Sequence, residues 1–298
     1  MKILLFGCNG QVGWELQRAL APLGDLVALA FDSRDPAADF SRPHELATTV
    51  RAVRPDVIVN AAAHTAVDKA ESEPGLAHTI NAEAPGVLAA EAAASNTWLV
   101  HYSTDYVFDG TGNRPWTEDD PTGPLSVYGR TKLEGEQRVR ASGCRHLILR
   151  TSWVYAARGG NFARTMLKLA AERDELKVID DQVGAPTSAD LLADVTAHAL
   201  RSAIAKPELA GTYHAVAAGE TSWHGYAKLV IEWARARGVP VRVAPERIVA
   251  VPSSAYPLPA RRPLNSRLDT QRLQRAFGLT MPPWQPGVQR MLAEVRGR

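Results

Sequence analysis

The chain has 298 residues, of which 45% are apolar, and its formal net charge at pH 7 is +2. This length and composition allow one large domain or two smaller ones, each with a sizeable core. A charge this small argues against nucleic acid as a partner. No stretch approaches the roughly 20 apolar residues that cross a bilayer, and the N-terminal apolar run is too short for a signal peptide. With two cysteines and no disulfide framework, we expect a soluble cytoplasmic protein with no membrane partner.

The first half of the chain alternates short apolar runs with stretches of helical periodicity. Strands that alternate with helices predict βαβ units, and therefore a parallel sheet that is covered on both faces. The predicted strands are residues 3–6, 26–31, 56–60, 98–102 and 146–150, and the predicted helices include residues 12–23, 44–53, 75–94 and 126–141.

After residue 155 the pattern becomes less regular. Helical stretches near 160–173, 188–204 and 222–237 are separated by short strand candidates and proline-rich segments. We interpret residues 1–155 as a Rossmann-type dinucleotide-binding domain, an α/β fold with a doubly wound parallel sheet. Residues 156–298 would mainly form a smaller substrate-binding lobe, with strands or helices that could return to the first domain.

A glycine-rich loop joins the first predicted strand to the first helix. Gly7, Gly10 and Gly13 give a G-x-x-G-x-x-G spacing that opens this helix. Such glycines permit a tight turn, a close approach of the backbone to a pyrophosphate, and close packing of helix on strand. The strand–loop–helix context favours a dinucleotide site over a plain turn.

The end of the second strand is where dinucleotide-binding proteins read the adenosine ribose. An acidic residue there favours NADH, whereas a nearby arginine accommodates the 2′-phosphate of NADPH. This sequence offers both Asp32 and Arg34, so the choice between NADH and NADPH stays open. Asp39 and Phe40, a little further on, could flank the adenine or form a solvated loop pair.

Tyr128 and Lys132 form a Y-x-x-x-K pair inside a predicted helix, which places both on one helix face. Reduction of a ketone builds negative charge on its oxygen, and that oxygen must be protonated. Tyrosine has an ordinary pKa near ~10, and a neighbouring ammonium lowers it. Thr104, at the end of the fourth strand, could hydrogen-bond the same oxygen, although it could also be a turn cap.

Seven motifs are spread along the chain: GCNGQVG, NAAAHTAVDKAE, STDYVFDG, YGRTK, RTSWVY, DQVGAPT and PARRPLNSRL. Together they resemble those of the dTDP-4-dehydrorhamnose reductase family, within the extended short-chain dehydrogenase/reductase superfamily. The resemblance covers the chain from Met1 to about Glu294. It implies NAD(P)H-dependent reduction of the 4-keto group of dTDP-4-dehydro-L-rhamnose to dTDP-L-rhamnose, the last step of that biosynthesis.

The resemblance also implies roles for individual residues. Tyr128 would donate the proton, Lys132 would hold the nicotinamide ribose, and Thr104, Asp105 and Trp153 would contact the sugar nucleotide. From the residues alone, Trp153 could equally be a core tryptophan. Together with Gly7 and the Tyr128–Lys132 pair, the positions that would line the cofactor are Gly10, Gln11, Val12, Asp39, Phe40, Ala63, His64, Thr65 and Tyr102.

Polar segments of the second half could hold the remainder of the substrate. Residues 182–187 and the pair Arg261–Arg262 could contact the diphosphate–thymidine arm. Alternatively, the two arginines are exposed at the surface and contact no ligand.

Two features depart from the family pattern. Family members often carry an acid at the end of strand two, where this chain has Ala30. Some relatives bind Mg²⁺ at a dimer interface through three acids, and the matching residues here are Glu15, Asp190 and Glu294. Carboxylates suit this hard cation, but Asp190 is one methylene shorter than the usual glutamate. A homodimer with Mg²⁺ and three unrelated surface acids are both compatible with the sequence.

The same scaffold is compatible with other functions. A sugar-nucleotide epimerase or 4,6-dehydratase is one alternative, but the dehydratase needs an acid pair after the threonine, and Asp105 is followed by Tyr106. A regulatory subunit resembling that of methionine adenosyltransferase need not keep the Tyr–Lys pair, which this chain retains. Reduction of another dTDP-4-keto-6-deoxy sugar remains open, because fold and catalytic pair do not set sugar stereochemistry.

Overall fold

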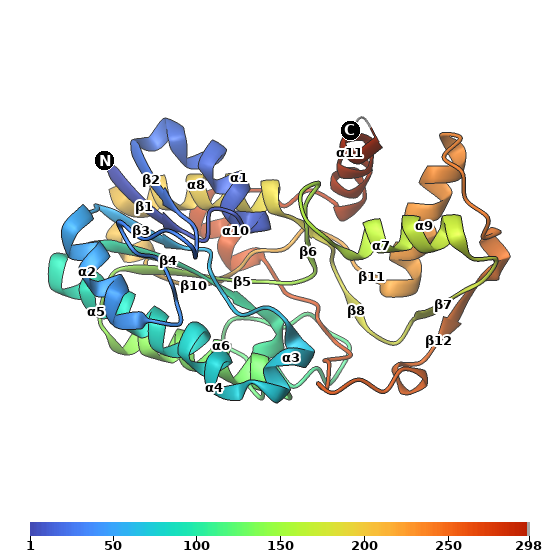
Figure 1. Ribbon diagram of the computed structural model, residues 1–298, viewed down its shortest axis with the longest axis horizontal. Helices are drawn as coiled ribbons and strands as arrows, with labels where there is room; N and C mark the ends of the chain where they lie inside the picture. The colour runs from blue at the N-terminus through green and yellow to red at the C-terminus, as the bar shows by residue number, and fades with distance from the viewer. Residues whose placement is uncertain (297–298) are drawn as a thin grey trace.

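A six-stranded parallel sheet forms the centre of the larger lobe in the computed structural model, which describes residues 1–296 (Figure 1). The strand order is β10-β5-β4-β3-β1-β2, and each neighbouring pair runs parallel. The predicted doubly wound sheet is therefore confirmed. Its strands are β1 (Lys2–Phe6), β2 (Asp25–Leu29), β3 (Val57–Asn60), β4 (Trp98–Thr104), β5 (His146–Thr151) and β10 (Gly211–His214).

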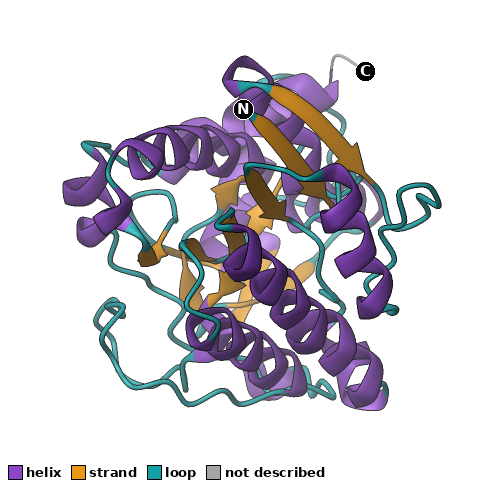
Figure 2. Ribbon diagram, turned by 90° about the vertical axis from the view of Figure 1, so that its left-hand side faces the viewer, coloured by secondary structure: helices purple, strands orange, loops and turns teal. Residues whose placement is uncertain are grey.

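Helices cover both faces of this sheet because side chains of the buried strands alternate between two cores. In β1, Ile3 and Leu5 pack on one side, whereas Leu4 and Phe6 pack on the other. The first side is covered by α1 (Gln11–Leu20), α8 (Ala189–Ala205) and α10 (Gln271–Phe277), and the second by α2 (Pro43–Val53), α5 (Ala84–Ser95) and α6 (Val127–Ala141). The layers are visible in Figure 2.

The chain returns to the sheet after residue 155. Strand β10 pairs with β5 along the sheet edge, with Gly211 opposite Leu147. Helices α8 and α10 also belong to the sheet core. Residues far along the chain thus complete the central sheet and the helical layer on one of its faces.

The second lobe lies to the right in Figure 1 and has its own aromatic-rich core around Tyr226, Trp233 and Trp284. Its helices are α7 (Phe162–Glu172), α9 (Trp223–Ala236) and α11 (Trp284–Arg296). Its short strands pair as β7 (Leu176–Ile179) with β12 (Ile248–Val251), and β8 (Val183–Gly184) with β11 (Thr221–Ser222). Strands β6 (Val154–Tyr155) and β9 (Thr187–Ser188) pair where the chain passes between the lobes.

Two predicted elements differ from the structure. The second strand ends at Leu29 and not at Phe31, because the chain turns there and leaves Phe31 73% exposed. The single helix predicted over 75–94 is three segments: α4 (Pro74–His78), the π-helical turn η2 (Thr79–Glu83) and α5. Helix α6 lies so close to this π-turn that a Cβ on Gly135 would be 2.2 Å from the Asn81 carbonyl oxygen.

The remaining helical segments are short. They are α3 (Val67–Ser72), η1 (Ala21–Leu23), η3 (Asp105–Val107), η4 (Pro207–Leu209), η5 (Pro245–Arg247) and η6 (Ser253–Ala255). Among residues 1–296, none of the helices combines the length and apolarity that crossing a bilayer requires.

Candidate active site

The glycine loop lies where the strand order reverses, between β1 and β3. Chains that leave neighbouring strands in opposite directions open a crevice at this point of a parallel sheet. Gly7 has φ +81°, and a Cβ there would lie 2.8 Å from the backbone of Ala61, so the two loops touch. A Cβ on Gly13 would be 2.0 Å from the Gly7 carbonyl oxygen. The glycines are therefore required for the contacts of α1 with the strand ends.

The first turn of α1 is open to an anion. Its N-cap is Gly10, with no side-chain cap hydrogen bond, and no acidic residue lies in the first turn. Free N–H groups and the positive end of the helix dipole favour a phosphate at such a terminus. Gln11, in this turn, donates from Nε2 to the Gly160 carbonyl oxygen at 3.0 Å, and Val12 packs toward the sheet core.

The predicted cofactor loop of Ala63, His64 and Thr65 follows β3 and is held by Asn81. The Asn81 side chain accepts from the His64 N–H at 2.8 Å and donates to the His64 carbonyl oxygen at 3.1 Å. It also donates to Thr131 Oγ1 in α6 at 3.2 Å. Asn81 thus joins this loop to the helix of Tyr128 and Lys132. No spacing in the sequence singled it out.

Two predicted cofactor residues have rings that serve the core. The Phe40 ring is 5% exposed and meets Phe6 edge-on, with centroids 5.5 Å apart. The Tyr102 hydroxyl bonds Thr196 Oγ1 at 2.6 Å, on the α8 side of the sheet. Both rings therefore pack inside the protein and are not free to contact a cofactor.

Asp39, the third predicted residue of this region, has an ionised carboxylate that is well supported. It accepts from the Ser41 N–H at 2.9 Å. Burial raises the pKa of Asp39, but hydrogen bonds from Ser41 outweigh burial and hold the pKa below its usual value.

The structure brings Tyr128 and Lys132 together in the first turns of α6. Ser126 caps this helix by accepting from the Gly129 N–H at 3.2 Å. Lys132 is 3% exposed, and its Nζ donates to the Tyr102 carbonyl oxygen at 2.6 Å. Burial lowers the pKa of Lys132 to about 8 and raises the pKa of Tyr128 to about 12, because each charged form loses its hydration.

Thr104 and Asp105, at the end of β4, lie near Tyr128. We call Thr104, Asp105, Tyr128 and Lys132 the polar cluster. The side chain of Thr104 lies near Tyr128 and partly offsets the effect of burial on the pKa of Tyr128. Thr104 Oγ1 also donates to Asp105 Oδ1 at 3.1 Å. Asp105 is 2% exposed, and burial raises its pKa to about 6. Its Oδ2 has no hydrogen-bond partner among residues 1–296. The cluster therefore offers two hydroxyls and a carboxyl side by side.

Two neighbours of this cluster were missed at the level of sequence. The Tyr106 ring meets the Tyr128 ring edge-on, with centroids 5.4 Å apart. Ser266 lies near the Asp105 carboxyl and opposes the rise in its pKa. Ser266 lies in the motif PARRPLNSRL, but no spacing pointed to its partner. In the same segment Arg262 pairs with Asp68 at 2.8 Å, so its guanidinium is already engaged.

Trp153 belongs to an aromatic platform, formed by the stacked rings of Trp153 and Trp223. Their centroids are 3.7 Å apart and their planes differ by 13°. The Trp223 Nε1 donates to Gln182 Oε1 at 3.1 Å, and Phe162 lies against Trp223 at 4.6 Å. Trp153 has φ +49°, and a Cβ on Gly184 would be 2.9 Å from its ring. Trp223 was not anticipated, because it lies about 70 residues further along the chain.

The three predicted metal ligands line a single cavity of about 380 Å³. Burial raises the pKa of Glu15, and the nearby charges of Asp190 and Glu294 raise it further. Arg18 lies 3.7 Å from Glu15, and Arg290 lies 3.4 Å from Asp190. Within residues 1–296, no group of three His, Cys, Asp or Glu side chains could hold a metal ion.

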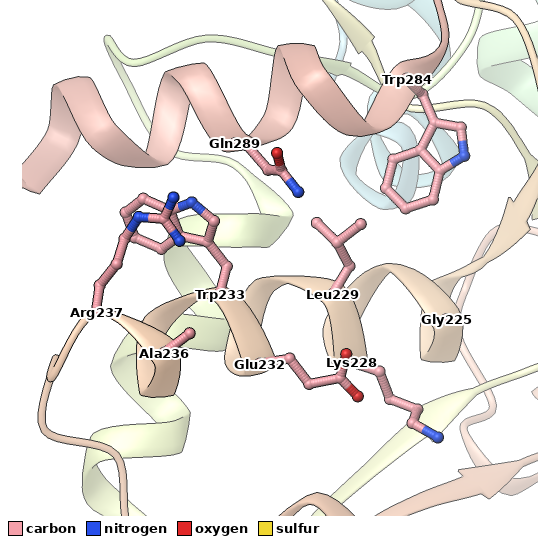
Figure 3. Close-up of a pocket in the computed structure, with 9 residues that line it drawn as sticks. All are labelled: Gly225, Lys228, Leu229, Glu232, Trp233, Ala236, Arg237, Trp284 and Gln289. Atoms are coloured by element: carbon pink, nitrogen blue, oxygen red, sulfur yellow. The ribbon is translucent and has the colours of Figure 1, made fainter.

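A larger groove of about 550 Å³ lies elsewhere, between α9 and α11 (Figure 3). Leu229 and Gln289 point into it, and the Arg237 guanidinium stacks on Trp233 at 4.4 Å. None of the predicted site residues lines this groove. The polar cluster at the sheet edge therefore remains the candidate site.

Comparisons with known proteins decide the family. Residues 1–296 match the family model described as the RmlD substrate binding domain. The dTDP-4-dehydrorhamnose reductase of Escherichia coli K12 is 60% identical over 295 residues, which cover 99% of this chain and 98% of that relative. The chain belongs to the dTDP-4-dehydrorhamnose reductase family.

Solved structures of relatives agree. A dTDP-4-dehydrorhamnose reductase of Clostridium acetobutylicum matches with a TM-score of 0.88 and 37% identity, covering 99% of this chain and 100% of that one. That of Bacillus anthracis str. Ames, in complex with NADP, matches with a TM-score of 0.86 and 32% identity, covering 98% and 99%. The predicted NAD(P)-dependent reductase activity, the final step of dTDP-L-rhamnose synthesis, is thereby confirmed, and it prevails over the dehydratase and the regulatory subunit.

Proposed function

We propose that the reduction takes place where Tyr128, Thr104 and Asp105 meet, with the 4-keto oxygen held by the Tyr128 and Thr104 hydroxyls. The observation that carries this proposal is the position of Thr104 beside Tyr128, near enough to lower the pKa of that phenol, with the buried ammonium of Lys132 one helical turn away. Two neighbouring hydroxyls can both donate to one carbonyl oxygen placed between them.

The site fits a nicotinamide dinucleotide. The open first turn of α1 would take the pyrophosphate, through the backbone of Gly10, Gln11 and Val12. Lys132 uses one of its three N–H donors on the Tyr102 carbonyl oxygen, and we assign another to the nicotinamide ribose. A bound reduced nicotinamide would supply the hydride for C4 of the sugar.

The cofactor is proposed to be NADPH, with NADH accepted more weakly. Arg34 and Arg42 are exposed beyond β2, and both act on the Asp39 carboxylate. They add positive charge to the region where the adenosine ribose lies in this fold. A relative was solved with NADP.

Tyr128 is suited to the acid role. With a pKa of about 12 it is protonated at neutral pH, so it holds the proton that the developing alkoxide takes up. The Lys132 ammonium stabilises the phenolate that remains. Proton donation of this kind contributes about 10²–10⁴-fold to a rate.

The sugar nucleotide is assigned to the sheet edge and the second lobe. Asp105 offers an unpartnered carboxyl oxygen to a sugar hydroxyl, and the aromatic platform of Trp153 and Trp223 offers a flat apolar surface to a ring. We propose that the elements after residue 155 outside the sheet form the substrate-binding lobe. A homodimer and Mg²⁺ at Glu15, Asp190 and Glu294 stay predictions.

The test is oxidation of NADPH, followed by its absorbance, with the 4-keto sugar made in situ from dTDP-glucose by a dehydratase and a 3,5-epimerase. Tyr128→Phe should lower kcat by about 10²–10⁴-fold and leave NADPH binding unchanged. Tyr213→Phe, which removes a hydroxyl bonded to the Leu209 carbonyl oxygen, is the matched control. Near-normal turnover by Tyr128→Phe would show that another group is the acid, and turnover without the epimerase would show that another sugar is the substrate.

A further inference from the structure

A fully buried carboxylate lies one helical turn beyond Lys132. Glu136 is 0% exposed, and its Oε1 and Oε2 accept from Arg150 Nε and Nη2 at 2.8 and 2.7 Å. Arg140 Nη1 donates to Oε2 at 2.9 Å. A buried ion pair is weak evidence for stability, because desolvation can exceed the attraction between the charges. Its place on the catalytic helix therefore calls for a functional reason.

The carboxylate of Glu136 is kept ionised. Burial by itself would raise its pKa, but the hydrogen bonds and charge of Arg150 hold the pKa of Glu136 below its usual value. Arg150 is itself enclosed, since its guanidinium lies over the Phe108 ring at 5.1 Å. The side chains that would have to move to neutralise Glu136 are packed in place.

Lys132 meets few other charges on the inner side of its helix. His101, from β4, is buried, and burial holds its pKa well below the usual value, so it is neutral. Burial lowers the pKa of His214, in β10, to about 3, so it too is neutral. Asp105, at the end of β4, acts on Tyr128.

The outer side of α6 carries its own pairs. There Glu134 lies 2.8 Å from Arg138 and 3.0 Å from His78 of α4, and Glu83 of η2 lies 3.3 Å from that histidine. Glu71 of α3 accepts from the Val127 N–H. Among the described residues, Glu136 is the charged group that raises the pKa of Lys132 against the effect of burial.

We propose that Glu136 is a positioning residue: its locked, buried carboxylate keeps Lys132 in the ammonium form and thereby sets the upper pH limit of the reductase. The proposal rests on the role given to Lys132 above. Glu136 touches neither substrate nor cofactor, and it acts through Lys132 alone. Arg150 and Arg140 hold the carboxylate and favour its ionised form.

The sign of the effect follows from the charges. A carboxylate favours the protonated form of a neighbouring amine, so removing it lowers the pKa of the amine. Glu136→Gln should therefore deprotonate Lys132 at lower pH. Both the ribose contact and the stabilisation of the Tyr128 phenolate should then be lost earlier as the pH rises.

The experiment compares Glu136→Gln with the unmodified protein in two measurements. These are kcat/KM against pH, and the dissociation constant of NADPH against pH, followed by nicotinamide fluorescence. Each profile has a basic limb, where kcat/KM or NADPH affinity falls as the pH rises. Both basic limbs should move down by about one pH unit in Glu136→Gln. Glu134→Gln removes a carboxylate from the exposed side of the same helix and should move neither limb. Glu136→Asp keeps a carboxylate at this position, so both basic limbs should lie close to their pH in the unmodified protein.

Removing one partner of a buried ion pair is strongly destabilising, so the double variant Glu136→Gln with Arg150→Met is made as well. It lacks the buried charge of Arg150 and should show the same downward shift. Basic limbs at their original pH in a folded Glu136→Gln or double variant would overturn the proposal, because a purely structural role does not move them.

Lys132→Met separates this failure from that of the proposed function. Loss of turnover in Lys132→Met, together with unmoved limbs in the Glu136 variants, would overturn only the role of Glu136. Unmodified turnover in Lys132→Met would overturn the role of Lys132 itself, and that of Glu136 with it.

Discussion

The polar cluster at the sheet edge and the aromatic platform of the second lobe are built on opposite principles. Thr104, Asp105 and Lys132 are buried polar groups, and burial shifts the pKa of Asp105 and of Lys132 against its charged form. Trp153 and Trp223 gain from contact, because stacked aromatic rings are favourable in themselves. Burial of polar groups therefore lowers stability at the proposed reaction centre, whereas ring stacking raises stability at the proposed substrate platform.

Asp105→Asn tests most directly whether burial of this carboxyl lowers the stability of the fold, and it should have the largest effect. Burial raises the folded-state pKa of Asp105 to about 6, above the ordinary aspartate value of about 4, so Asp105 adds stability only at low pH and loses it as the pH rises from about 4 to about 6. The asparagine should raise the free energy of unfolding at pH 7.5 by on the order of 2 kcal/mol. It should also lower kcat/KM by about 10–100-fold, since a hydrogen bond to a charged group is lost.

Urea unfolding at pH 4.5 and 7.5, with steady-state kinetics, measures both effects. Asp174→Asn is the control, because its carboxylate is exposed and pairs with Arg242; it should change stability by less than about 0.5 kcal/mol. If Asp105→Asn lowers the free energy of unfolding at pH 7.5, the buried Asp105 carboxylate does not destabilise the fold and the prediction is wrong.

Trp223→Leu probes the other region. Loss of the stacked pair should raise KM for the sugar nucleotide by about 3–10-fold, with kcat within about twofold, because stacking binds substrate and transition state alike. Trp233→Phe, on the same helix but in the groove against α11, should leave KM unchanged. A fall in kcat at constant KM would instead assign the platform to the chemical step.

Arg34→Ala should have the smallest effect, as befits an exposed charge outside both regions. We expect kcat/KM with NADPH to fall by about 2–5-fold while the value with NADH is unchanged. Arg51→Ala, another exposed arginine, which pairs with Glu91, is the control. Equal losses with both cofactors would contradict the assignment of Arg34 to the 2′-phosphate.

The sequence by itself determined the local parts of this protein. Apolar runs such as residues 3–6 and 98–102 indicated buried parallel strands, and the glycine spacing at 7–13 indicated the first turn of α1, because each pattern depends on neighbours within a few residues. Tyr128 and Lys132 were found for the same reason, since a helix places i and i+4 on one face.

Only the tertiary structure decided which distant segments meet. It placed β10 beside β5, Trp223 on Trp153, Ser266 against Asp105, and the Phe40 ring in the core. Such contacts join residues far apart in the chain, and no short-range periodicity encodes them. They arise from how the two cores close over the sheet, and the same closure buries the Glu136 carboxylate beside Arg150. Burial in turn sets the pKa of each group at the site, because the loss of hydration is decided by the surrounding packing and not by the chain order.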